Sequence, residues 1–393
     1  MAILVSREGE LLNCTLRWNH IIEPKYEKPG REVDKAFISF AELSQVTGLD
    51  VEAEVNRQLA KILERIKNTP KGNKVYEGPE GICFARDRLY WYDQYFNEID
   101  PPEKIKGSMV LSFFNNRISS LEGSPRVVGG DFSCSQTSIT SLEGGPEEVG
   151  GIFSCSSTSI TSLEGCPKKV GGSFNCSSTS ITSLKGCPEK IRGNFWCSYT
   201  SITSLEGGPR EVEGNFFCQY TNITSLEGGL KKVGGSFNCS NTNITSLEGC
   251  PEEVGGSFYC SSTSITSLEG CPIKVGGSFW CNNTNITSLK GAPKNVGENF
   301  DCTNTNITSL EGSPEEVEGN FDCSFTKITS LEGCPKKVGG SFWCTGTKIT
   351  SLKCAPLEIG NMKYSRFPNS ISKQQLVAYK KWLKTNPKDN YPG

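Results

Sequence analysis

The 393-residue sequence has one histidine, no long hydrophobic run and almost no net charge. The single His20 excludes histidine-rich metal sites and most histidine-dependent catalysis. Its 41 Lys and Arg balance 43 Asp and Glu, which argues against a basic surface for nucleic acid or anionic membranes. No apolar stretch is long enough to span a membrane, and the N-terminus MAILVSREGELLNC is charged too early for a signal peptide. We therefore expect a cytoplasmic protein with no nucleic-acid or membrane partner.

The most abundant feature is a 21-residue repeat that runs from about Pro102 to Pro356. The unit that starts at Pro167 reads PKKVGGSFNCSSTSITSLKGC. An anchor isoleucine recurs twelve times without insertion or deletion, at Ile118, Ile139, Ile160, Ile181, Ile202, Ile223, Ile244, Ile265, Ile286, Ile307, Ile328 and Ile349. A unit this short cannot bury a core alone, so its neighbours must complete it. The repeat predicts a solenoid of about twelve coils.

Each unit predicts one short parallel strand and little helix. In the segment Phe174 to Cys176 the outer residues recur in kind while the middle one varies, which indicates a strand with Phe and Cys inward. A Thr three residues after each Cys, from Thr137 to Thr347, is expected to bond backbone groups of the adjacent turn. The following Leu and Val point inward, and Gly and Pro form the corners.

The pattern F-x-C-x-x-T-x-I has the spacing of the leucine-rich repeat L-x-L-x-x-N-x-L, and the first unit carries the expected Asn116. The array resembles the short bacterial leucine-rich repeats, and more closely the 21-residue arrays with SLEGxPxxVGGxFxCS units in proteins of tailed bacteriophages. This resemblance implies a parallel-strand arc that serves as a binding scaffold, expressed inside an infected bacterium. The valine lies one residue further from the strand than in the standard repeat. Bacterial relatives that are ubiquitin ligases carry a large C-terminal catalytic domain, for which the 37 residues after Pro356 leave no room.

The two ends of the chain do not repeat. Residues 1–101 are expected to form a small α+β domain, with an amphipathic helix over 50–67 opened by an Asp cap and strands after it. This domain would also cover the first coil of the solenoid, which spans 102–356. Residues 357–393 are expected to cap the last coil with an amphipathic helix over 372–384.

Eleven of the 19 cysteines form one ladder: Cys134, Cys155, Cys176, Cys197, Cys218, Cys239, Cys260, Cys281, Cys302, Cys323 and Cys344. Stacked strands place ladder Cβ atoms about 4.8 Å apart, further than the ~3.8 Å that a disulfide prefers. No C-x-x-C motif occurs and the array lacks histidine, so a metal site is not expected. We interpret the ladder as small buried hydrophobes in a reducing compartment, and expect neither metal nor other cofactor.

The residue between each Phe and Cys forms a column, here called the middle column, on the strand-lined inner surface. The residue three positions later forms a second column, here called the turn column. We predict that both bind a protein partner, through Trp196, Tyr199, Phe217, Tyr220, Tyr259, Trp280, Asp301, Asp322, Phe325 and Trp343. Large rigid rings on a rigid sheet are typical of binding hot spots. The alternative is that aromatic residues merely suit strands and stack across coils.

No residue group meets the requirements of catalysis, such as a nucleophile with a base or a phosphate loop. The sequence therefore predicts a non-enzymatic protein-binding scaffold. The phage resemblance favours a phage-encoded protein that captures and inhibits a host or defence protein. The alternatives are a structural or attachment component of the virion, and an enzyme within residues 1–101. The threonine column from Thr140 to Thr350 leaves ice binding as a further alternative, since regular Thr arrays on flat β-solenoids order water.

Overall fold

The computed structural model describes the backbone of strands β1 (Ala2–Val5) and β2 (Leu11–Thr15), residues 50, 53, 57 and 60, and residues 73–94, 96–111, 118–385 and 391. The chain divides into two compact units, Met1–Thr69 and Pro70–Gly393, and each is described by itself.

In the first unit, β1 and β2 pair antiparallel. Residues 53, 57 and 60 are helical, and the Asp50 carboxylate accepts a hydrogen bond from the Ala53 backbone N–H at 3.0 Å. This bond is the cap expected for the helix over 50–67. The other residues of that helix, and His20, lie outside the described residues.

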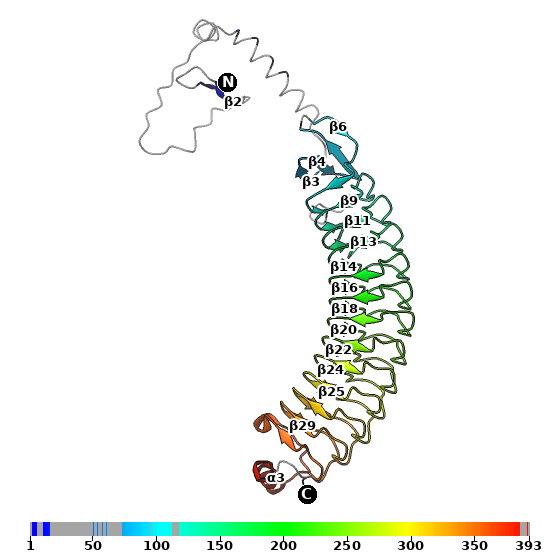
Figure 1. The fold of residues 1–393 in the computed structure, drawn as a ribbon, viewed down its shortest axis with the longest axis vertical. Helices are drawn as coiled ribbons and strands as arrows, with labels where there is room; N and C mark the ends of the chain where they lie inside the picture. The colour runs from blue at the N-terminus through cyan, green and yellow to red at the C-terminus, as the bar shows by residue number, and fades with distance from the viewer. Residues whose placement is uncertain are drawn as a thin grey trace, which may run out of the picture. The chain divides into compact units, whose positions relative to one another are not determined.

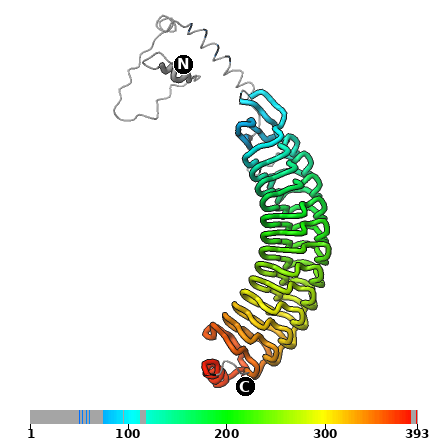
Figure 2. Tube along the Cα trace, in the orientation of Figure 1, coloured from blue at the N-terminus to red at the C-terminus, as the bar shows by residue number. Residues whose placement is uncertain are grey.

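In the second unit, every coil contributes a two-residue strand to one parallel sheet of twelve strands. The coils stack into an arc, and this sheet lies toward its inner side (Figures 1 and 2). Its strands are β8 (Met109–Val110), β10 (Phe132–Ser133), β12 (Phe153–Ser154), β14 (Phe174–Asn175), β16 (Phe195–Trp196), β18 (Phe216–Phe217), β20 (Phe237–Asn238), β22 (Phe258–Tyr259), β24 (Phe279–Trp280), β26 (Phe300–Asp301), β28 (Phe321–Asp322) and β30 (Phe342–Trp343). The predicted parallel β-solenoid of about twelve coils with little helix is confirmed.

A second set of parallel strands runs beside the first, in the segment that the sequence predicts to be a corner. It forms a four-stranded sheet of β7 (Lys104–Ile105), β9 (Val127–Val128), β11 (Glu148–Val149) and β13 (Lys169–Val170). A nine-stranded sheet continues with β15 (Lys190–Ile191), β17 (Glu211–Val212), β19 (Lys232–Val233), β21 (Glu253–Val254), β23 (Lys274–Val275), β25 (Asn295–Val296), β27 (Glu316–Val317), β29 (Lys337–Val338) and β31 (Glu358–Ile359). The valine or isoleucine of each strand points into the core.

From β10 onward the register between coils equals the sequence repeat, so each strand residue pairs with its equivalent 21 positions later, as Phe132 does with Phe153. The first coil is two residues longer, since Met109 pairs with Phe132 and Lys104 with Val127. The inward Phe side chains are buried and stack in one continuous column. The rings of Phe216 and Phe237, for example, have centroids 5.4 Å apart and planes inclined by 7°. Stacking of this kind adds about 0.5–1.5 kcal/mol per pair to the free energy gained from burial.

Two sets of polar side chains satisfy the backbone inside the array. The buried Thr hydroxyl donates to the carbonyl of the Cys three residues earlier, as Thr137 does to Cys134 at 2.6 Å. This is the role expected for that threonine. A second set, at the position before Phe, was not predicted: the Asn215 N–H donates to the Asn194 side-chain oxygen of the previous coil at 2.8 Å. Such bonds link successive coils where the two strand sets meet.

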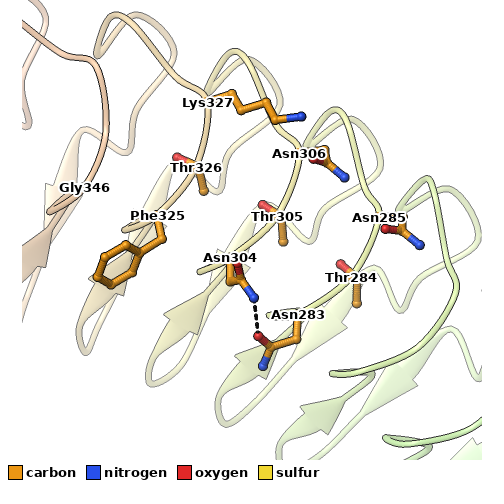
Figure 3. Close-up of a pocket in the computed structure, with 10 residues that line it drawn as sticks. All are labelled: Asn283, Thr284, Asn285, Asn304, Thr305, Asn306, Phe325, Thr326, Lys327 and Gly346. Carbon is orange, nitrogen blue, oxygen red and sulfur yellow. Dashed lines mark hydrogen bonds between the residues drawn. The ribbon is translucent and has the colours of Figure 1, made fainter.

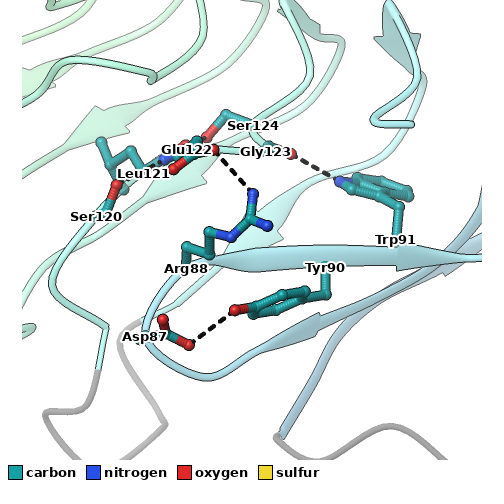
Figure 4. Close-up of polar contacts among 9 residues, drawn as sticks. All are labelled: Asp87, Arg88, Tyr90, Trp91, Ser120, Leu121, Glu122, Gly123 and Ser124. Carbon is teal, nitrogen blue, oxygen red and sulfur yellow. Dashed lines mark hydrogen bonds and ion pairs between the residues drawn. The ribbon is translucent and has the colours of Figure 1, made fainter. Parts of the chain in front are cut away.

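An antiparallel sheet covers the first coil. It consists of β3 (Asn73–Gly78), β4 (Gly81–Ala85), β5 (Leu89–Tyr92) and β6 (Glu98–Ile99). The buried Trp91 indole donates to the Gly123 carbonyl at 2.8 Å, and Arg88 pairs with Glu122 at 2.9 Å (Figure 4). The first compact unit ends at Thr69, whereas the sequence places the start of the solenoid at residue 102. The domain limits drawn from the repeat stay a prediction.

The C-terminal segment closes the last coil. A turn of 3₁₀ helix, η1 (Met362–Tyr364), precedes a short parallel bridge between Trp343 and Arg366. Helix α3 (Lys373–Thr385) follows, which confirms the predicted C-terminal helix. Its fully buried Tyr379 donates to the Pro356 carbonyl at 2.5 Å.

The eleven ladder cysteines are buried free thiols. The Cys176 thiol lies 3.3 Å from the Trp196 carbonyl of the next coil, and the other ladder thiols make equivalent contacts. Burial raises the pKa of Cys134 to about 12 and holds the pKa of Cys155 well above its ordinary value. Because the thiolate is the reactive species, these thiols are inert in the folded protein.

We expect a thiol-specific alkylating reagent at pH 8 to leave the ladder unmodified in the native protein and to modify it fully after unfolding. Peptide mass mapping of both samples measures this. Modification of Cys176 or Cys239 at native conditions, at the rate of an unfolded control, would contradict the buried-ladder assignment.

Candidate partner-binding face

The middle column lies half-buried on the twelve-stranded sheet, between buried Phe and Cys side chains. The in-register pairing joins its members into one row across the sheet, in the order Ser133, Ser154, Asn175, Trp196, Phe217, Asn238, Tyr259, Trp280, Asp301, Asp322 and Trp343. The inward and outward alternation expected from the sequence is therefore present in every coil from β10 to β30.

Four aromatic residues of the two columns gather on the coils of β16 and β18. Trp196 and Phe217 stack with centroids 6.3 Å apart, and Tyr199 and Tyr220 with centroids 4.7 Å apart and planes inclined by 10°. The two tyrosines remain 57% and 49% exposed. We call these four residues the aromatic cluster. A second stacked pair, Tyr259 and Trp280, follows two coils later with a centroid distance of 6.2 Å.

The turn column has a left-handed backbone, a feature absent from the sequence-based expectations. Its φ angles lie between 55° and 57° for Gln136, Ser157, Ser178, Tyr199, Tyr220, Asn241, Ser262, Asn283, Asn304 and Phe325, and reach 74° at Gly346. Asn and Gly accept this conformation, whereas bulky side chains are rare in it. The Ser, Asn and Gly residues that fill most of the column were the signal in the sequence. Tyr199, Tyr220 and Phe325 instead place a bulky ring at this position, and all three rings are exposed.

Asp301 and Asp322 occupy neighbouring positions of the middle column. Each carboxylate accepts a hydrogen bond from the backbone N–H two residues later, at 2.8 Å from Thr303 and 2.9 Å from Ser324. The same bond is made at equivalent positions by Asn175 and Asn238. Burial raises the pKa of both carboxyl groups, and Asp301 raises that of Asp322 further. The two aspartates thus hold the turn that follows the strand, at some electrostatic cost.

The two C-terminal tryptophans of the column differ in their surroundings. The Trp280 indole N–H is buried and has no hydrogen-bond partner among the described residues. The Trp343 indole N–H instead donates to the Tyr364 carbonyl at 2.7 Å, since the C-terminal segment lies against β30. The indole N–H of Trp343 is therefore already hydrogen-bonded within the chain.

Some of the charged residues after the corner prolines form exposed ion pairs between coils. Lys169 lies 2.8 Å from Glu148, and Lys337 lies 3.7 Å from Glu316. Exposed pairs of this kind contribute about 0–1 kcal/mol each. They relieve charge repulsion along the rim.

Neither a metal site nor a membrane span is found in the described part of the chain. No group of three His, Cys, Asp or Glu side chains there is arranged to hold a metal ion. No helix among those residues is long and apolar enough to cross a membrane. The threonine column from Thr140 to Thr350 is exposed, but the coils that carry it form an arc (Figure 2). The ice-binding alternative assumed a flat array of threonines, so this curvature argues against it.

Comparisons with known proteins give no family. No family model and no curated protein matches the chain. Among solved structures, YopM from Yersinia enterocolitica WA-314 is similar over 68% of this chain and 72% of that chain, with 13% sequence identity and a TM-score of 0.31. A similarity of this degree assigns neither a family nor a function, so the description of the solenoid rests on its own strand pairing.

Replacing Asp301 and Asp322 together by Asn should raise the melting temperature at pH 7. A carboxyl whose pKa is raised in the folded state binds more protons there than in the unfolded state, so stability falls as pH rises above about 3.8 through the folded pKa. The amide keeps the turn bond without the buried charge. The gain over wild type should shrink below pH 4.

Thermal unfolding of both proteins between pH 3 and pH 8 checks this prediction. Asn238→Asp is the matched control, because it introduces a carboxyl at an equivalent position and should lower the melting temperature at pH 7. An equal gain at every pH would show that burial of the two charges is not the cause.

Proposed function

We propose that this chain is a non-enzymatic scaffold that binds a protein partner through its aromatic face. The aromatic cluster forms the centre, with Tyr259, Trp280, Asp301, Asp322, Phe325 and Trp343 toward the C-terminal end. One observation carries the proposal: Tyr199 and Tyr220 place exposed rings at left-handed backbone positions, where most other coils use Ser or Asn. Neither core packing nor backbone geometry calls for a ring there.

The physical setting suits recognition of a protein surface. The strands that carry the cluster are paired on both sides within the sheet, so side chains rather than backbone groups are offered to a partner. Stacking of Tyr199 on Tyr220 holds both rings in place before binding, which lowers the entropy lost on association. Trp and Tyr are enriched among the hot spots of protein interfaces.

The finer part of the proposal concerns the partner. A phage-encoded chain of this kind would capture and inhibit a host or defence protein in the cytoplasm of the infected bacterium. Its support is the resemblance of the 21-residue unit to phage repeat arrays. Such an inhibitor is made early in infection and is absent from purified particles, whereas a virion component is found in them by mass spectrometry.

Two double variants test the binding face: Tyr199→Asn with Tyr220→Asn, and Trp196→Ala with Phe217→Ala. We expect each to abolish retention of the partner in a pull-down from bacterial extract with the full-length chain as bait. Ile273→Glu is the control, because Ile273 is also a large apolar residue, is 69% exposed and lies outside this face. Retention of the same partner by both double variants would contradict the proposal.

The Tyr199→Asn and Tyr220→Asn variant should keep its stability. Loss of ring stacking removes about 0.5–1.5 kcal/mol. Relief of the left-handed conformation returns an amount of the same order, since that conformation is disfavoured by about 1–2 kcal/mol for side chains larger than Gly and Asn. Denaturant unfolding should show a free energy of unfolding within about 1 kcal/mol of wild type. A larger loss would indicate that the rings serve the fold.

A further inference from the structure

A shallow polar hollow of about 530 Å³ lies just beyond the ends of strands β24, β26 and β28, apart from the aromatic cluster (Figure 3). It spans successive coils and is lined by Asn283, Thr284, Asn285, Asn304, Thr305, Asn306, Phe325, Thr326, Lys327 and Gly346. The three threonines are buried between two rows of longer side chains, and their hydroxyls already donate to Cys carbonyls. The rows are therefore the groups available to a ligand.

Four side-chain amides dominate the two rows. The Asn304 amide N–H donates to the Asn283 side-chain oxygen at 2.7 Å, which fixes the orientation of both groups. The amides of Asn285 and Asn306 make no side-chain hydrogen bond to other described residues. Each amide carries two donors and one acceptor oxygen, so most of this capacity is directed to solvent. Such a surface matches a ligand with closely spaced hydroxyl groups, which both donate and accept.

A single aromatic ring flanks these amides. Phe325 is 65% exposed on a left-handed backbone, and its ring lies beside Gly346 of the next coil. A Cβ atom at Gly346 would come within 2.6 Å of the ring, so only glycine at that position allows this placement. At the position of Phe325, most other coils have Ser, Asn or Gln. The pair Phe325 and Gly346 thus fixes one flat apolar surface at the end of the amide rows.

The single charge that lines the hollow is positive. Lys327 is the one charged residue among the ten that line it, and no carboxylate is present among them. Its ammonium group extends from the row of Asn285 and Asn306 (Figure 3). A ligand that uses the whole hollow therefore carries hydroxyl groups, an apolar face and a negative charge.

We infer that this hollow binds an acidic carbohydrate chain, such as an oligosaccharide of uronic acids. The amides would pair with adjacent ring hydroxyls, Phe325 would stack on the apolar face of a pyranose, and Lys327 would pair with a carboxylate. Adjacent coils lie about 4.8 Å apart, close to the length of one sugar unit in an extended chain. A peptide fits less well, because the strands here have no free edge and the hollow has no apolar groove or arginine cluster.

Calorimetric titration of the full-length chain with hexagalacturonate, and with neutral cellohexaose for comparison, tests this site. We expect saturable binding of hexagalacturonate with a Kd below about 1 mM, and weaker binding of cellohexaose. Asn283→Ser with Asn304→Ser, and Phe325→Asn, should each weaken hexagalacturonate binding at least about tenfold. Lys327→Ser should reduce it to the level of cellohexaose. These substitutions introduce residue types that the repeat itself uses at the same positions.

Asn241→Ser makes the same change in the turn column outside the hollow and should leave binding unchanged. The assignment is overturned if hexagalacturonate does not bind, if the Asn and Phe variants bind it as wild type does, or if Asn241→Ser weakens it equally. Equal binding of a decapeptide of alternating Ser and Asp would also overturn it, in favour of a peptide site. Failure here leaves the protein-binding proposal intact, because the pull-down variants lie on other coils.

Discussion

The structure depends on parallel pairing between coils at an offset of 21 residues, the same as the sequence repeat. Because the offset is constant from β10 to β30, each side chain there lies against its own equivalent, and the Phe, Cys and Ile columns fill one uninterrupted core. A 21-residue unit gains this burial only from its neighbours. The antiparallel sheet β3–β6 and helix α3 then cover the two coils that lack a neighbour.

The same register arranges the surface. Since the backbone repeats from coil to coil, most variation falls at solvent-facing positions, and a change of residue type in one unit changes one place in a column. Aromatic residues in two adjacent coils therefore make the aromatic cluster, and asparagines in two later coils make the polar hollow. A single scaffold thus carries two chemically different surfaces.

Much of the fold follows from the sequence because the period reports directly on stacking. The coil number, the inward Phe and Cys residues, the buried Thr hydroxyls and the C-terminal helix were all predicted correctly. The second strand set was missed, since its strands, such as β11, contain two residues beside glycines and show no alternation. The inter-coil bonds of Asn194 and Asn215 were missed because this position is mostly polar and varies mainly between Asn and Ser. It therefore shows no hydrophobic periodicity that would mark it as structural.

For the candidate sites, the sequence alone determined which residues share a column, because column membership depends only on the repeat. The tertiary structure decided what each member can do. It shows Tyr199, Tyr220 and Phe325 on a left-handed backbone, Trp343 bonded to Tyr364, and the Phe325 ring beside Gly346. The Ser, Asn and Gly residues of the turn column hint at its backbone angle, but the last two features are contacts between residues one coil apart, which no local sequence pattern encodes.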